Sequence, residues 1–148
     1  MLPLLLTTAA TGMLIGLSFT IQLVHYPLFA RVGAAAWPAY AAEHATRIGI
    51  IVLPWMALEA ASGAWLALHP PAGLSRPLIW AAAALVAGTW LLTLLLNGPL
   101  FSRLAAGWDP ALHRTLVLAN WPRTVLWVAR GTLLLVLLAQ AWRTRGGS

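Results

Sequence analysis

Four long apolar runs dominate the chain, and short turns rich in proline and glycine separate them. A helix needs about 20 apolar residues to cross a bilayer, so each run is long enough to do so. We therefore predict four transmembrane helices at about residues 3–29, 38–69, 76–104 and 110–142. Because the connections are short, sequential helices should be antiparallel, and the expected fold is an all-α, up-down-up-down four-helix bundle.

Polar residues are concentrated in the first parts of the second and fourth predicted helices. The remainder of each helix is apolar and contains one proline, Pro54 or Pro122. Both helices are longer than the ~30 Å hydrocarbon core requires, so we expect both to extend beyond the membrane on the same side. Their spanning parts should lie near residues 49–68 and 121–140. Apart from this shared plan, we recognise no repeat that relates the two halves of the chain.

The composition supports a membrane protein. Of the 148 residues, 61% are hydrophobic and only 8% are charged, whereas a soluble domain has about 45–50% apolar and about 25% charged residues. The length fits a single transmembrane domain that covers residues 1–148. The expected environment is therefore the lipid bilayer, with the chain crossing it several times.

The chain is basic, with a formal net charge of +6. Nucleic-acid binding requires a basic face outside the membrane, and here the arginines occur singly or in pairs along helices and turns. We therefore expect no nucleic-acid partner. The absence of cysteine excludes disulfides, thiolate metal ligands and thiol catalysis.

Glu59 and Arg130 are each the only ionisable residue in the middle of a predicted helix. An unpaired charge at the bilayer centre costs at least ~2.5–3.5 kcal/mol. The second and fourth helices run in the same direction, and the depths of the two residues agree within about one 1.5 Å rise. We predict a buried ion pair between them. A structural pair, a proton or ion relay and a protonated Glu59 are the alternatives.

A second polar layer is expected at the end of the bundle where the polar helix parts emerge. All four helices contribute to it, with Gln22, His25, Tyr26, Tyr40, Glu43, His44, Arg47, Asn97, His113, Asn120 and Arg123. Imidazole is the commonest metal ligand and titrates near neutral pH. Three interpretations stay open: a metal or haem site with His25, His44 and His113 as ligands, a polar ligand pocket, and a structural hydrogen-bond network.

Specific roles follow if the layer is an active site. The expected catalytic residues are Tyr40, His44, His113 and Asn120, and the expected ligand-binding residues are Gln22, Arg47, Asn97 and Arg123. The two arginines would hold an anionic group, because a guanidinium can bind one with two parallel hydrogen bonds.

Several short motifs resemble those of a known group of proteins. They are His25-Tyr26-Pro27, Tyr40-x-x-x-His44-x-x-Arg47, Pro54-x-Met56-x-x-Glu59 and Asn120-Trp121-x-Arg123. Together they resemble small bacterial four-helix membrane proteins, and the layout is loosely similar to the anthrone-oxygenase-like family. The resemblance implies a membrane location, expected to be a bacterial inner membrane, and oxidation of a small hydrophobic molecule.

Two functions follow from these observations. The first is an oxidoreductase or oxygenase that acts on a small lipophilic substrate at the polar end. The second is a non-enzymatic subunit or small carrier within a homo-oligomer or a larger membrane complex. A visible absorption band would indicate haem, and a stoichiometric partner would favour the second function.

Overall fold

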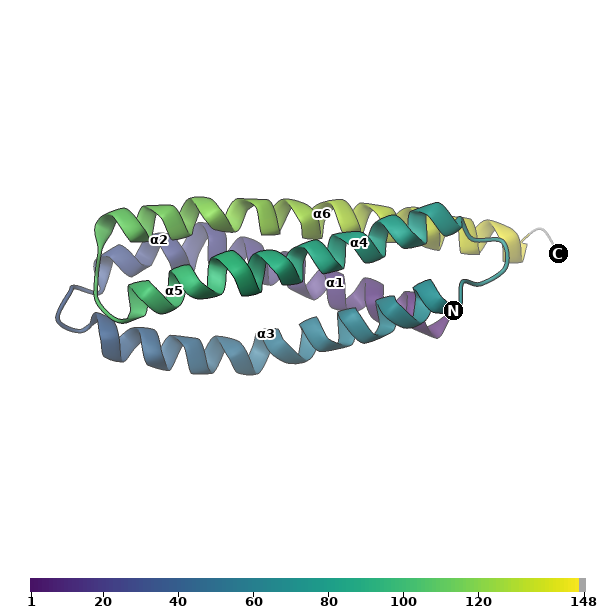
Figure 1. Ribbon diagram of the computed structural model, residues 1–148. Coiled ribbons are helices and arrows are strands. Elements are labelled where there is room, and N and C mark those ends of the chain that lie inside the picture. Colours follow the sequence, from purple (N-terminus) through teal and green to yellow (C-terminus); the bar gives the residue numbers. More distant parts are fainter. Residues whose placement is uncertain (147–148) are drawn as a thin grey trace.

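The computed structural model describes residues 1–146 as four long helical segments (Figure 1). The first segment comprises α1 (Leu2–Thr20), the π-helical turn η1 (Ile21–His25), α2 (Tyr26–Leu28) and the 3-10 turn η2 (Phe29–Arg31). The second is α3 (Trp37–Leu68). The third comprises α4 (Arg76–Leu92), the π-helical turn η3 (Thr93–Asn97) and α5 (Gly98–Ala105), and the fourth is α6 (Pro110–Gly146). The predicted helices are confirmed, with small shifts at their ends.

All four segments are long and apolar enough to cross a membrane. They contain 30, 32, 30 and 35 residues within the candidate spans, and this fits an integral membrane protein that crosses the bilayer four times. Figure 1 shows α2, α5 and the beginnings of α3 and α6 together at one end, which we call the polar end. The polar first parts of the second and fourth helices therefore lie beside the ends of the first and third.

The four segments form a ring in which each packs mainly against two neighbours. α1 packs against α3 and α6, and α4 likewise packs against α6 and α3. The helices α3 and α6 therefore lie diagonally across the bundle. A side chain of α3 that contacts α6 does so at the bundle axis.

Prolines and one aspartate fix where the helices begin. Pro38 and Pro77 lie in the first turns of α3 and α4, where a missing N–H leaves no hydrogen bond unmade. At the start of α6, Asp109 Oδ1 accepts hydrogen bonds from the N–H groups of Ala111 and Leu112, at 2.7 and 3.1 Å. This side-chain cap satisfies two of the N–H groups that a helix start leaves without partners.

The π-helical turns occupy matching places in the first and third segments. The N–H of Tyr26 reaches back to the carbonyl of Ile21, and the N–H of Gly98 reaches back to that of Thr93. Each turn is followed by a proline. In a regular helix a proline ring clashes with the carbonyl four positions earlier, and the additional residue of a π turn relieves that clash.

The matching turns reveal a repeat, which corrects our expectation that the two halves are unrelated. The sequences Pro-Leu-Phe-Ala-Arg at 27–31 and Pro-Leu-Phe-Ser-Arg at 99–103 follow the two turns. Pro38 and Pro110, which open α3 and α6, are separated by the same interval as these two motifs. The bundle therefore consists of two related helical hairpins, residues 2–68 and 76–146.

Equivalent residues of the two hairpins meet inside the bundle. The rings of Phe29 and Phe101, one from each repeated motif, lie 6.2 Å apart. Elsewhere along the axis, Trp127 Nε1 of α6 donates to Glu59 Oε2 of α3 at 3.2 Å. The two hairpins therefore contact each other both at the polar end and in the middle of the bundle.

Candidate functional site

The predicted pair of Glu59 and Arg130 lies at the bundle axis. Arg130 Nε is 3.1 Å from Glu59 Oε1, and the two side chains are 1% and 0% exposed. Arg130 also donates to Thr11 Oγ1 at 3.1 Å, to Thr7 Oγ1 at 2.5 Å and to the carbonyl oxygen of Ala82. Each guanidinium nitrogen therefore has an acceptor.

The carboxylate of Glu59 is equally well bonded. One oxygen accepts from Thr11 Oγ1 at 2.7 Å, and the other accepts from Trp127 Nε1 at 3.2 Å. Gly63 provides room for the guanidinium, because a Cβ atom at this position would lie 2.9 Å from one of the terminal nitrogens of Arg130. A buried charge pair with its hydrogen bonds complete is a structural element, and we assign it to the fold.

Three of the predicted site residues connect α6 to the first segment. His113 Nε2 donates to the carbonyl oxygen of Tyr26 at 2.7 Å, and its ring packs against Trp108. Asn120 Nδ2 donates to Gln22 Oε1 at 2.8 Å, and Gln22 Nε2 donates to the carbonyl oxygen of Val117 at 3.1 Å. These bonds occupy the polar atoms of Gln22 and close the interface between the two segments.

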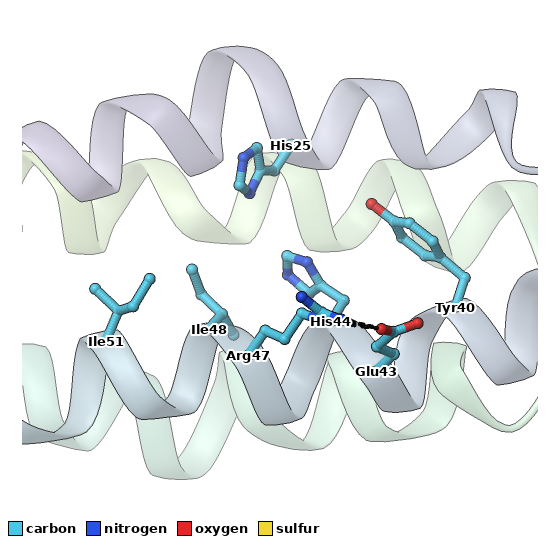
Figure 2. Close-up of a pocket in the computed structure, with 7 residues that line it drawn as sticks. All are labelled: His25, Tyr40, Glu43, His44, Arg47, Ile48 and Ile51. Atoms are coloured by element: carbon cyan, nitrogen blue, oxygen red, sulfur yellow. Dashed lines mark hydrogen bonds and ion pairs between the residues drawn. The ribbon is translucent and has the colours of Figure 1, made fainter.

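A groove of about 300 Å³ lies between η1 and α3 at the polar end (Figure 2). It is lined by His25, Tyr40, Glu43, His44, Arg47, Ile48 and Ile51. The rings of His25 and His44 meet edge to face at 5.6 Å, and Tyr40 stacks on His44 at 6.1 Å. Arg47 pairs with Glu43 at 2.5 Å, but both side chains are exposed, and such a pair contributes little to stability.

The structure does not bring the three predicted histidine ligands together. His25 and His44 are in contact, whereas His113 bonds to the backbone on the α6 side. The expectation assumed a regular helix, but the η1 turn rotates His25 toward α3 while Gln22 faces α6. Within residues 1–146 no three His, Asp or Glu side chains are close enough to hold a metal ion.

A second cavity, of about 220 Å³, lies between α3 and the third segment, and we call it the lateral cavity. Its lining residues are Ile21, Tyr26, His44, Ala45, Ile48, Gly49, Val52, Leu53, Met56, Thr93, Asn97, Gly98, Phe101 and Arg123. Apolar side chains form most of the wall. His44 and Ile48 line both this cavity and the groove, so the two spaces adjoin at these residues.

Arg123 is a buried cation at the lateral cavity. It is 7% exposed, and it donates to Asn120 Oδ1 at 2.7 Å and to Thr93 Oγ1 at 3.4 Å. Its guanidinium carbon lies 5.3 Å from the ring centre of Trp127, which is a cation–π distance. Its Nε has no hydrogen-bond partner, and no carboxylate in the described part of the chain lies within 4 Å of it.

Asn97 adds unused hydrogen-bonding capacity to the same cavity. It is 2% exposed, and neither its Nδ2 nor its Oδ1 has a partner within the described residues. Its counterpart in the first hairpin, His25, likewise has a buried Nδ1 without a partner there. Buried polar groups are nearly always hydrogen-bonded, and each one left unpaired costs about 1–3 kcal/mol. Residues with such atoms are therefore candidates for contact with a ligand.

The predicted site residues separate into three groups in space. Gln22, Asn120 and His113 close the interface with the first segment, His25, Tyr40, His44 and Arg47 line the groove, and Asn97 and Arg123 line the lateral cavity. The sequence analysis offered a polar ligand pocket as one interpretation, but it did not assign Thr93 to that pocket or place a cavity between α3 and the third segment. The sequence did contain one indication of these sites: a polar residue, His25 or Asn97, stands two positions before each of Pro27 and Pro99.

Comparison of the chain with family models, with curated proteins and with solved structures finds no match. Function is therefore argued from the geometry of these spaces.

Proposed function

We propose that this protein binds a small lipophilic molecule with an anionic head group in the lateral cavity. The observation that supports this most strongly is Arg123, a buried cation that has no carboxylate partner among the described residues. It lines the same cavity as Asn97, whose amide atoms also lack partners there. A buried charged side chain without a counter-ion is costly in a membrane protein, and such residues usually pair with another group. An anion supplied by a ligand would offset that cost.

The donors at the cavity suit a carboxylate. A guanidinium has five N–H donors in a planar fork; Arg123 donates to Asn120 and Thr93, and the Tyr26 side chain also interacts with it. The remaining donors and the Asn97 amide can bond to the two oxygens of a carboxylate, and bonds to charged groups are the stronger kind. The apolar wall accommodates the hydrophobic part of the ligand.

The proposal is one of binding. Oxidation of the bound molecule, which the family resemblance implies, would act on this same ligand. His44 lies at the wall that the lateral cavity shares with the groove. Imidazole exchanges protons near neutral pH, so His44 is the residue that we propose for acid–base chemistry on a bound head group.

Thermal unfolding in a mild uncharged detergent tests this proposal with two ligands of equal chain length. We expect decanoate to raise the unfolding midpoint and decanol to have a much smaller effect, because binding to the folded state stabilises it. Arg123→Met should weaken decanoate binding by about 10- to 150-fold, which corresponds to the ~1.5–3 kcal/mol of a hydrogen bond to a charged group.

Arg103→Met is the matched control, because Arg103 is exposed and the substitution removes the same charge. It should leave the decanoate effect intact. Equal effects of decanoate and decanol on the wild-type protein, or unchanged decanoate binding by Arg123→Met, would contradict the proposal.

A further inference from the structure

A third cavity, which we call the small-residue cavity, lies farther along α3, at its interface with α4. It has a volume of about 150 Å³ and is lined by Ala60, Gly63, Ala64, Ala83, Val86 and Ala87. On α3 the lateral cavity ends at Met56, and the small-residue cavity begins one turn later at Ala60. The two cavities therefore follow one another on the same face of α3, with helical spacing of three or four residues.

The combined length is that of a lipid chain. From Gly49 to Ala64 the helix rises about 22 Å at 1.5 Å per residue. One leaflet of a bilayer has about half of the ~30 Å hydrocarbon thickness, so the two cavities together are longer than one leaflet is deep. The polar groups are found at one end only, where Arg123 and Asn97 lie.

We infer that the ligand is a long-chain fatty acid, with its carboxylate at Arg123 and Asn97 and its hydrocarbon chain along the α3–α4 interface. The inference rests on the proposed function and extends it to the substrate class. A row of small residues alone would not identify a ligand. Here the row lies one helical turn from the lateral cavity, where Asn97, 2% exposed, has two polar atoms without partners among the described residues.

The geometry favours one chain and a small head group. The small-residue cavity lies between two helices, α3 and α4, and its volume is modest. A phospholipid carries two chains and a larger head group. A single-chain carboxylate fits one narrow interface with a cation at its end, and the small side chains of Ala60 and Ala64 leave space for its methylenes.

Binding of tritiated palmitate to the full-length protein in mild detergent tests this inference, with octanoate as the short competitor. Each buried methylene raises affinity up to about fourfold, so palmitate should bind at least about 100-fold more tightly than octanoate. Ala64→Leu places a larger side chain in the small-residue cavity. It should weaken palmitate binding by about tenfold or more and leave octanoate binding within about twofold of wild type.

Ala61→Leu is the control on the same helix, because Ala61 and Ala64 are both exposed but only Ala64 lines the cavity. It should bind both acids as the wild type does. Ala87→Leu, with Ala84→Leu as its control, repeats the comparison on α4 should Ala64→Leu fail to fold.

The outcomes separate this inference from the proposed function. Suppose that Arg123→Met abolishes octanoate binding but the wild type binds palmitate no more tightly than octanoate. The proposed site for the hydrocarbon chain is then wrong, and the site for the carboxylate at Arg123 stands. If neither acid binds to the wild-type protein, both are wrong. Competition by phosphatidylglycerol as strong as that by palmitate would show that a phospholipid occupies the interface instead. A wild-type dimer that Ala64→Leu disrupts would show that a second copy of the chain occupies it.

Discussion

Arg123 and Arg130 lie two turns apart on α6, and both are almost fully buried, yet their surroundings differ. Every guanidinium nitrogen of Arg130 has an acceptor, and Glu59 neutralises its charge. Arg123 has no carboxylate within the described residues, its Nε lacks an acceptor, and it borders a cavity. The type and burial of a residue therefore do not decide its role. What differs between the two arginines is whether every guanidinium nitrogen has an acceptor and whether a carboxylate neutralises the charge.

The two related hairpins explain where the cavity comes from. Gln22 and Asn120 bond to each other and close the interface between the first segment and α6. At the same interval along the sequence, their counterparts are Leu94, which is 61% exposed, and Ile48, which lines the lateral cavity. Apolar residues thus replace the Gln22–Asn120 hydrogen bond at the equivalent interface, which is the one between the third segment and α3. The lateral cavity lies at that interface.

The largest effect is expected from separating the central pair. Arg130→Met and Glu59→Gln should each cost about 3–5 kcal/mol of unfolding free energy, because each leaves a buried charge or its hydrogen bonds without a partner. The double variant Glu59→Leu with Arg130→Met should cost less than either single change. Unfolding in detergent measures all three, and single variants as stable as the wild type would show that the pair contributes nothing to the fold.

A smaller effect is expected from filling the space beside Arg130. In Gly63→Ala the new methyl group would lie 2.9 Å from a terminal nitrogen of Arg130. Overpacking of this kind costs about 1–3 kcal/mol. Gly12→Ala is the control, since a Cβ there meets nothing within 4 Å, and it should leave stability unchanged or raise it by roughly 0.5–1 kcal/mol. Equal results for the two glycines would remove the packing argument.

Removing the unpartnered amide should stabilise the ligand-free protein. Asn97→Leu replaces a buried polar group that has no partner among the described residues by an apolar one of similar size. We expect a gain of about 1 kcal/mol in unfolding free energy, together with weaker decanoate binding. A loss of stability would indicate that the amide is bonded within the protein.

The smallest effect on stability is expected for Arg123→Met in the absence of ligand. The change relieves the cost of a buried charge, and it removes two hydrogen bonds, one of which is long at 3.4 Å. These two effects oppose each other, so the net change should be about 1 kcal/mol or less. A loss as large as that of Arg130→Met would assign Arg123 to the fold as well.

The helices and the Glu59–Arg130 pair could be predicted from the sequence, because both follow from the position of residues along the bilayer normal. Apolar runs gave the helix positions, and no π turn interrupts the helix before Glu59 or Arg130, so their depths could be counted directly. Pairing then followed from the cost of a lone charge in lipid.

The candidate site could not be predicted in the same way. The π turns η1 and η3 change the rotation of every residue after them, so helical spacing placed His25 in one row with Gln22, although the two side chains face different helices. The lateral cavity depends on how the side chains of α3 and the third segment pack, and no pattern of residue types in the sequence predicts that. The repeat became visible once the two turns showed which positions correspond.

The most direct test of the contrast between the two arginines is to supply Arg123 with a carboxylate from within the protein. Thr93 Oγ1 lies 3.4 Å from Arg123, so Thr93→Asp places a carboxylate beside the guanidinium, and Thr93→Asn provides the same shape without the charge. The measurement is the difference in ligand-free unfolding free energy between these two variants. If Arg123 lacks a partner, the Asp variant should be more stable than the Asn variant by about 1.5–3 kcal/mol and should no longer bind decanoate. The opposite result is that the Asp variant is no more stable than the Asn variant and still binds decanoate. That result would contradict the proposal that Arg123 binds an anionic ligand.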